Sequence, residues 1–510
     1  MVAPPRSKMP VQSLAQPTYE ITDADRARQK RIALAWQAYN GELDPPLKPM
    51  DDGTDDNVLT NRCQAIVDRG VDFLFGKELD IAVEKGAPTE AQDFLDTVWG
   101  RTEQRIPLLQ ELAMNGATAG SAFLRINPQP PVESEVSGTP PKQDFELTVV
   151  DPAIVVGIKT APQNCNKVLL YCIQYSETET IDGVSREVFY REEMTANYPD
   201  PVPGKPAPTK PTSWSIQHWT HVSQKGAPPK LTDWTAAGAP IAWNYPFPPM
   251  FDCKNLPMPN SPWGKPDLTP DLIGLNKALN RLLSGINATE GLYGEPLLYA
   301  VDTGSSTIAR KRGQVIELPL PTSKIEAVHI VSEVPAGLAF AADLRSDIDE
   351  QSGVPGVATG RISTMPRGNL SGIAIELLHS PITKKTDKKR CLYGELIIDV
   401  SQALLVLNGK SGDIKITLAW QDPLPKDDLQ AIQGAVTKLE LGMTKTTVLR
   451  GLGEDPDEEA KLRTSPTEIA LNTDIQSAMP PGEPGAPLLP NQPPPAPVAP
   501  AAIGQAGKQP

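Results

Sequence analysis

Apolar residues recur at helical spacing in the stretch that begins near residue 260. They are Leu268, Leu272, Leu275, Leu279, Leu282 and Ile286, separated by three or four positions. Thr269 and Pro270 suit the N-cap and the first turn of a helix. The spacing predicts one long helix, roughly 30 Å in length at ~1.5 Å per residue. We expect its other face to meet water, because polar residues lie between the apolar ones: Asn276, Lys277, Asn280, Arg281, Ser284 and Asn287.

Two further helices are predicted after this one. Residues 292–334 have the pattern of short strands, and a second helix is expected over about 335–352. It ends in a segment rich in Gly and Pro, whose backbone suits neither regular element. A third helix runs from near Ser371 to Asn408 and Gly409, with Pro381 as an expected kink.

The rest of the chain alternates between helical and strand patterns. Helices are predicted within 21–43, 61–75, 89–100 and 105–116, and one antiparallel sheet over 145–194 from the runs FELTVV, AIVVGI, KVLLYCIQY and REVFYREE. A strand over 410–425 is expected to return to that sheet, and two helices are expected within 426–463. The fold class is therefore α+β, with several domains.

Composition narrows the class of protein. The chain has 510 residues, of which 55 are proline, so much of it must be loop, linker or tail. Five scattered cysteines without a C-x-x-C spacing favour a reduced, cytosolic fold. We find no apolar run long enough to span a bilayer and no apolar core of a signal peptide near the first residue. The net charge of −14 disfavours a broad basic surface that grips nucleic acid.

Motifs for catalysis are not found. Gly409-Lys410-Ser411 looks like the end of a phosphate-binding P-loop, but Leu404 stands where its first glycine is required, and the triplet follows a helix. His218 and His221 are three residues apart, which on a strand places them on opposite faces and disfavours a metal site. We therefore predict no catalytic residues, no metal and no cofactor.

Several short stretches together resemble the portal proteins of tailed double-stranded-DNA bacteriophages. They are NVLTNRCQAIVDRGVDFLFGKE (57–78), NGATAGSAFLRI (115–126), VVDP (149–152), NSPWGKPDL (260–268), SGVPGVATG with NLSGIAIE (352–376), and WQDPLPKD (420–427). The order of helix, small β insert, helix, loop and kinked helix is similar to that family as well.

The resemblance implies a multidomain portal fold, with long stem helices, a small β clip, an α/β wing and a helical crown. Its expected parts are a disordered N-terminus (1–20), wing (21–262, with a Pro/Trp-rich insertion over 197–262), first stem helix (263–291), clip (292–334), second stem helix (335–353), tunnel loop (354–369), kinked wing helix (370–409), wing strand (410–425), crown (426–463) and Pro-rich disordered tail (464–510).

The resemblance also implies a function and partners. Portal subunits form a ring, typically a dodecamer, at one capsid vertex, through which DNA is packaged and ejected without sequence specificity. Expected partners are further copies of the chain, the terminase large subunit, the major capsid and scaffolding proteins, and head-completion or tail-adaptor proteins. The expected location is the virion, after assembly in the host cytoplasm. Two alternatives stay open: another structural connector or tail-adaptor ring, and an enzyme with a cryptic site.

Three basic groups are candidates for contact with DNA or partners. In the expected tunnel loop, Arg361 and Arg367 either touch phosphate or belong to an exposed linker. At the clip turn, Arg310, Lys311 and Arg312 are either solvated or contact an acidic partner or DNA. In the kinked helix, Lys384, Lys385, Lys388, Lys389 and Arg390 bind phosphate, face packaged DNA, pair with acidic groups of a neighbouring subunit, or are solvated; we favour pairing or solvation.

Overall fold

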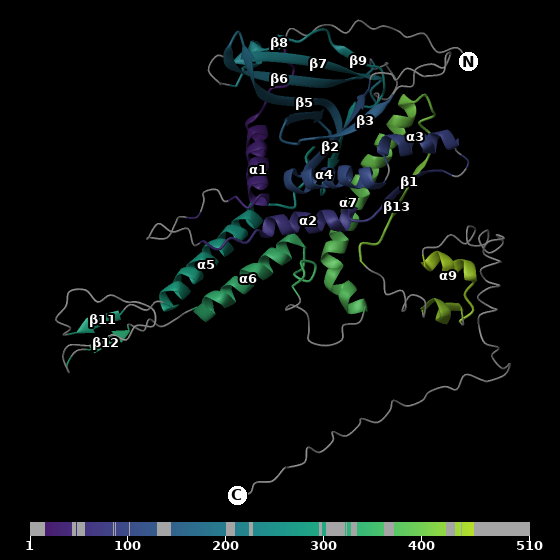
Figure 1. Cartoon of the computed structure of the whole chain (residues 1–510). Helices are drawn as coiled ribbons and strands as arrows, with labels where there is room; N and C mark the ends of the chain where they lie inside the picture. Colours follow the sequence, from purple (N-terminus) through teal and green to yellow (C-terminus); the bar gives the residue numbers. More distant parts are fainter. Residues whose placement is uncertain are drawn as a thin grey trace, which may run out of the picture. The chain divides into compact units, whose positions relative to one another are not determined.

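The computed structural model describes most of the chain (Figure 1). The described residues are 16–42, 47, 57–84, 86, 88–100, 102–129, 144–199, 210–223, 228–294, 298–301, 322, 324–327, 334–361, 372–424, 434–439 and 441–452. The chain divides into two compact units, Met1–Leu424 and Pro425–Pro510. The first unit contains both helices and sheets, which confirms the α+β class.

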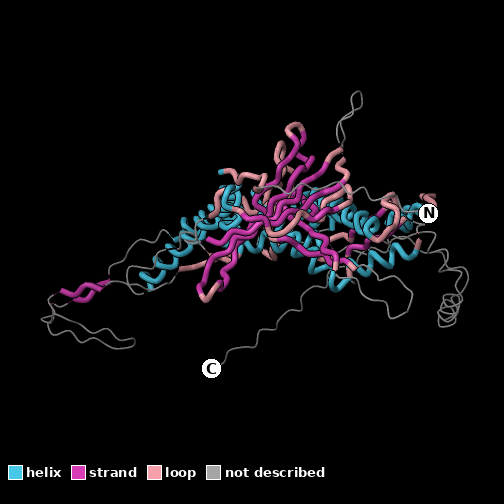
Figure 2. Tube along the Cα trace, turned by 90° about the horizontal axis from the view of Figure 1, so that it is seen from above, coloured by secondary structure: helices cyan, strands magenta, loops and turns pink. Residues whose placement is uncertain are grey.

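An antiparallel six-stranded sheet forms the largest β element of the first unit. Its strands are β4 (Val155–Ala161), β5 (Asn164–Ile181), β6 (Val184–Asn197), β7 (Ser213–Ser223) and β8 (Thr235–Ala236) in that order, with β9 (Ile241–Trp243) also paired to β7. Figure 1 shows β5, β6 and β7 side by side, and in the view from above the strands lie in front of helices (Figure 2). Asp182 and Gly183 have positive φ angles of 52° and 77° at the β5–β6 turn, as a tight Asp-Gly hairpin requires.

The first of the predicted strands lies in a different sheet. β3 (Phe145–Val150) pairs with β2 (Ser121–Pro128), which pairs in turn with β10 (Met250–Lys254). The prediction of one sheet over 145–194 is therefore wrong for FELTVV. Apolar side chains of the two sheets, such as Phe123 on β2 and Ile173 on β5, share one core. The alternation of apolar and polar residues in a strand therefore indicates which side chains are buried, but not which strand is its hydrogen-bonded neighbour.

The helices before this sheet region match the predicted ones closely. They are α1 (Asp23–Tyr39), α2 (Arg62–Phe75), α3 (Thr89–Trp99) and α4 (Thr102–Ala119). The core that they share with the later helix α7 (Gly372–Leu407) includes the buried ring of Trp99, whose Nε1 donates to Ser401 Oγ at 2.9 Å. The main core of the first unit is therefore built largely from helices, with residues of β1 (Leu79–Val83), β2, β3, β10 and β13 (Ile416–Trp420) packed into it.

The predicted series of helix, β insert, helix and kinked helix is present. It consists of α5 (Pro270–Gly294), the antiparallel pair β11 (Leu298–Val301) and β12 (Lys324–Ala327), α6 (Val334–Ser352) and α7, which contains Pro381. α5 and α6 pack against each other through apolar residues, among them Leu279 and Leu344. Between α6 and the described start of α7, residues 353–361 form consecutive tight turns.

The strand expected to return to the large sheet does not reach it. Among the described strands, β13 pairs with β1 alone, as an antiparallel two-stranded sheet. The Cδ1 of Leu418 on β13 lies near Gly394 of α7. The apolar face of β13 therefore packs against α7. The prediction that this strand joins the large sheet is wrong.

In the second unit, residues 434–439 are helical, and α9 (Lys445–Leu452) follows. The predicted tail over 464–510 and the acidic DPDEEAKLR segment lie outside the described residues. Among the helices that the structure describes, none is both long and apolar enough to cross a membrane.

Candidate functional site where α5, α6 and α7 meet

The polar stripe of α5 does not meet water along its length. Asn276, Asn280 and Ser284 are buried, and they bind the extended segment 57–62 that leads into α2. Asn280 Oδ1 accepts from both the backbone N–H and the hydroxyl of Thr60 at 2.9 Å. The expectation of a solvated face is therefore wrong for these three residues. Their side chains, and not water, bind the polar groups of segment 57–62.

We expect Asn280→Ala to lower the free energy of unfolding by about 1–3 kcal/mol, because it removes the buried acceptor that binds both donors of Thr60. Chemical denaturation followed by tryptophan fluorescence measures this change. Arg281→Ala is the matched control, because Arg281 is exposed on the same helix, and it should stay within about 0.5 kcal/mol of wild type. Equal stability of the two variants would contradict the assigned role of Asn280.

The carboxylate of Asp267 lies at the start of α5 and binds two lysines of α7. Its side chain is fully buried and lies 2.5 Å from Lys389 Nζ and 3.0 Å from Lys385 Nζ. Asn255 Nδ2 donates to it at 3.2 Å. Lys385 also donates to the backbone oxygen of Ser352, the last residue of α6, at 2.8 Å. One buried ionic centre therefore connects the ends of α5 and α6 to the middle of α7.

The charges of this centre support one another. Burial by itself raises the pKa of Asp267, but the ammonium groups of Lys385 and Lys389 together outweigh burial and hold that pKa well below its usual range. Burial lowers the pKa of Lys389, and the Asp267 carboxylate opposes this shift. Because burial penalises an unpaired ion far more than a paired one, each partner depends on the other.

The basic cluster of the kinked helix is divided among three environments. Lys385 and Lys389 bind Asp267, whereas Lys384 and Lys388 are exposed. Arg390 donates to the backbone oxygen of Gln421 at 2.6 Å. The spacing of four between Lys385 and Lys389 is visible in the sequence, but the sequence does not show which face of α7 is covered.

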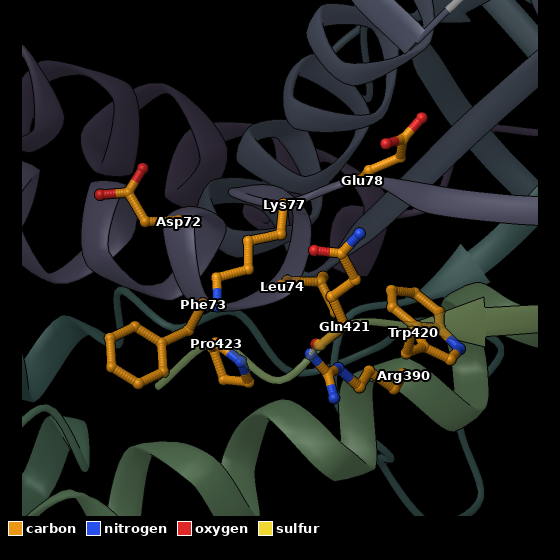
Figure 3. Close-up of a pocket in the computed structure, with 9 residues that line it drawn as sticks. All are labelled: Asp72, Phe73, Leu74, Lys77, Glu78, Arg390, Trp420, Gln421 and Pro423. Carbon is orange, nitrogen blue, oxygen red and sulfur yellow. Dashed lines mark hydrogen bonds between the residues drawn. The ribbon is translucent and has the colours of Figure 1, made fainter. Parts of the chain in front are cut away.

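Arg390 lines a small pocket where β13 ends (Figure 3). Its guanidinium lies 5.2 Å from the ring centroid of Trp420, and burial lowers its pKa. Lys77, from the end of α2, donates to the backbone oxygen of Asp422 on the same exiting segment. The two cations thus hold the last residues of the first unit against α2 and α7.

Of the two candidate tunnel-loop arginines, Arg361 lies within the described residues. Its guanidinium forms an ion pair with Asp349 of α6. Asp349 also accepts from Arg62 of α2 at 2.9 Å, so two arginines share one carboxylate. Arg361 thus fixes the end of the 353–361 turns to α6. Arg367 and the predicted clip-turn residues Arg310, Lys311 and Arg312 lie outside the described residues.

The features considered for catalysis have structural partners. Gly409 follows the end of α7 with a positive φ of 71°, and Lys410 forms an ion pair with Glu90. His221 Nδ1 lies 2.9 Å from the backbone oxygen of Asp233, and its ring lies near those of Phe189 and Trp234. Within the described part of the chain, no group of His, Cys, Asp or Glu side chains is arranged to hold a metal ion.

Part of this site lies in a stretch that matches a known family. Residues 340–464 match the family model described as "Phage portal protein, SPP1 Gp6-like". The resemblance to phage portal proteins is thereby confirmed. The matched stretch begins within α6 and includes Asp349, Arg361, all of α7 and β13. Asp267 and α5 precede it.

Solved structures give a second comparison. One similar chain comes from "Neck of native GTA particle computed with C12 symmetry", with 14% identity and a TM-score of 0.39 over 77% of this chain and 90% of that chain. Another comes from "Neck of empty GTA particle computed with C6 symmetry", with 13% identity, the same TM-score and the same coverage. The search of curated proteins found no match.

Proposed function

We propose that this chain is the subunit of a portal ring through which double-stranded DNA enters and leaves a virion capsid. The observation that carries the proposal is the portal-family match over residues 340–464. The series of α5, the β11–β12 pair, α6 and α7 supports it, because this is the order expected of stem, clip, stem and kinked wing helix.

The charge of the chain agrees with a conduit. A net charge of −14 lowers non-specific affinity for a polyanion, so duplex DNA moves past such a wall with little retention. The proposed ring is a dodecamer that contacts DNA without sequence specificity. It docks the terminase large subunit during packaging, and then head-completion and tail-adaptor proteins, and it meets capsid and scaffolding proteins at the vertex.

The role proposed is mechanical and not catalytic. Hydrolysis of ATP then belongs to the terminase, and the portal-like chain supplies its docking ring. The rival function is a connector or tail-adaptor ring that has no part in DNA translocation. Procapsids assembled without this chain separate the two functions: they should fail to package DNA if the chain is a portal, and should fill but fail to attach tails if it is an adaptor.

The oligomeric state of the purified protein tests the ring. We expect light scattering to give a mass that is a large multiple of the 55.0 kDa chain, and negative-stain images to show rings with an opening wide enough for a DNA duplex. A compact monomer at all concentrations and in the presence of capsid and scaffolding proteins would overturn the proposal.

A further inference from the structure

α6 carries an exposed acidic stripe, defined by Phe340, Asp343, Asp347 and Glu350. These positions recur every three or four residues, so they share one side of the helix. The ring of Phe340 is 55% exposed although it is large and apolar. The buried residues Leu344 and Ile348 lie on the adjacent side of the helix, so the stripe borders the buried face. Among the described residues the three carboxylates have no ion-pair partner, so the described part of the chain leaves this side of α6 open.

α7 carries an exposed basic stripe, defined by Leu377, Lys384 and Lys388. The side chain of Leu377 is 72% exposed, and both lysines are exposed. Their spacings of seven and four residues place them on one side of the helix, which is continuous through Pro381. Within the described part of the chain neither lysine has a recorded ion-pair partner, in contrast to Lys385 and Lys389 on the next face.

The two stripes match in order and in spacing. In each helix an exposed apolar residue precedes the charges, and the interval from Phe340 to Asp347 equals that from Leu377 to Lys384. Each interval is seven residues, or about 10 Å along a helix. Two such helices running in the same direction would place the apolar residues together, Asp347 beside Lys384, and Glu350 beside Lys388.

The stripes do not cover each other within one chain. α6 and α7 approach where Lys385 binds the backbone oxygen of Ser352, and both stripes remain exposed there. A contact that uses two different surfaces of the same molecule is heterologous, and it closes into a ring when the rotation between copies divides a full turn. A head-to-tail contact between copies therefore fits this pair of surfaces better than a contact of one surface with itself does.

We infer that the acidic stripe of α6 binds the basic stripe of α7 on a neighbouring copy of this chain. This contact rests on the proposed ring, in which it would join each copy head to tail to the next. The charges select the partner and the register, whereas Phe340 and Leu377 contribute apolar area.

Charge reversal on each side, followed by mixing, tests this contact. Lys384→Glu/Lys388→Glu and Asp347→Lys/Glu350→Lys each place like charges at both of the paired positions. Each double variant alone should need about tenfold more protein for half-assembly, measured by native mass spectrometry and light scattering. An equal mixture of the two should restore assembly, because alternating copies again bring opposite charges together.

The control is Lys30→Glu/Lys159→Glu, which makes the same change in net charge as the reversed lysine variant at exposed lysines outside both stripes; it should assemble like wild type. Rings formed equally well by wild type and by both reversed variants would overturn this contact and leave the ring proposal intact. Loss of assembly that mixing does not restore would also overturn the proposed contact. This is the result expected if Lys384 and Lys388 serve only to bind DNA. Absence of oligomers from wild type and from the mixture would overturn both.

Discussion

Asp267→Asn is expected to lower the free energy of unfolding by about 3–5 kcal/mol. The substitution keeps the shape of the side chain but leaves Lys389, which is almost fully buried, and Lys385 without a carboxylate. Denaturant unfolding followed by tryptophan fluorescence measures the loss. Asp80→Asn is the matched control, because Asp80 is exposed on β1, and its effect should be within about 0.5 kcal/mol.

The same comparison has a predicted pH dependence. The pKa of Asp267 is held well below its usual range in the folded chain, so its stabilising contribution is complete above the ordinary carboxyl pKa of about 4. It decreases as pH falls below that value, because the unfolded chain then binds a proton that the folded chain excludes. The difference between wild type and Asp267→Asn should therefore be constant from about pH 5 to 8 and shrink in stronger acid. A difference that grows in acid would contradict the assignment.

Gly264→Ala is expected to destabilise the chain by about 3 kcal/mol. A Cβ on Gly264 would lie 2.2 Å from the backbone oxygen of Gly120 and 2.9 Å from the backbone nitrogen of Asn255. Both contacts are backbone atoms, so no flexible side chain can yield. Gly264 N also donates to the buried Ser121 Oγ at 3.0 Å, which fixes the loop three residues before Asp267.

Gly274→Ala is the control for this substitution and should have the opposite sign. Gly274 lies within α5, has no atom within 4 Å of an added Cβ and has no positive φ, so alanine should stabilise the helix by about 0.5–1 kcal/mol. Thermal melting of both variants measures the two effects. A Gly264→Ala variant as stable as wild type would show that the contact between the α4–β2 corner and this loop is not closed.

The order of elements could be predicted because it depends on local pattern. α5 and α7 are long enough for helical spacing to repeat several times, and Pro270 and Gly409 mark the start of one and the end of the other. The antiparallel arrangement of β4, β5 and β6 could also be predicted, because short turns join runs rich in β-branched and aromatic residues.

The candidate site could be predicted only in part, because its members are distant in sequence. The sequence places Lys385 and Lys389 in a basic cluster, but Asp267, more than a hundred residues earlier, has no local feature that marks it as their partner. The sequence makes Arg361 a candidate for contact with phosphate, whereas the described structure pairs it with Asp349 of α6. Asn280 has the side chain typical of a solvated helix face, and only the docking of segment 57–62 makes it an interior residue.

The sequence by itself determined the α+β class, the succession of stem-like helices, β insert and kinked helix, and the portal resemblance, because each depends on residues that are near one another along the chain. The tertiary structure decided which lysines of α7 are buried, which strand β13 pairs with, and that the backbones of Gly120 and Gly264 lie in close contact. Those outcomes depend on which surfaces are brought into contact, and desolvation then gives identical side chains opposite roles: Lys389 is buried against a carboxylate, and Lys388, one position earlier, faces water.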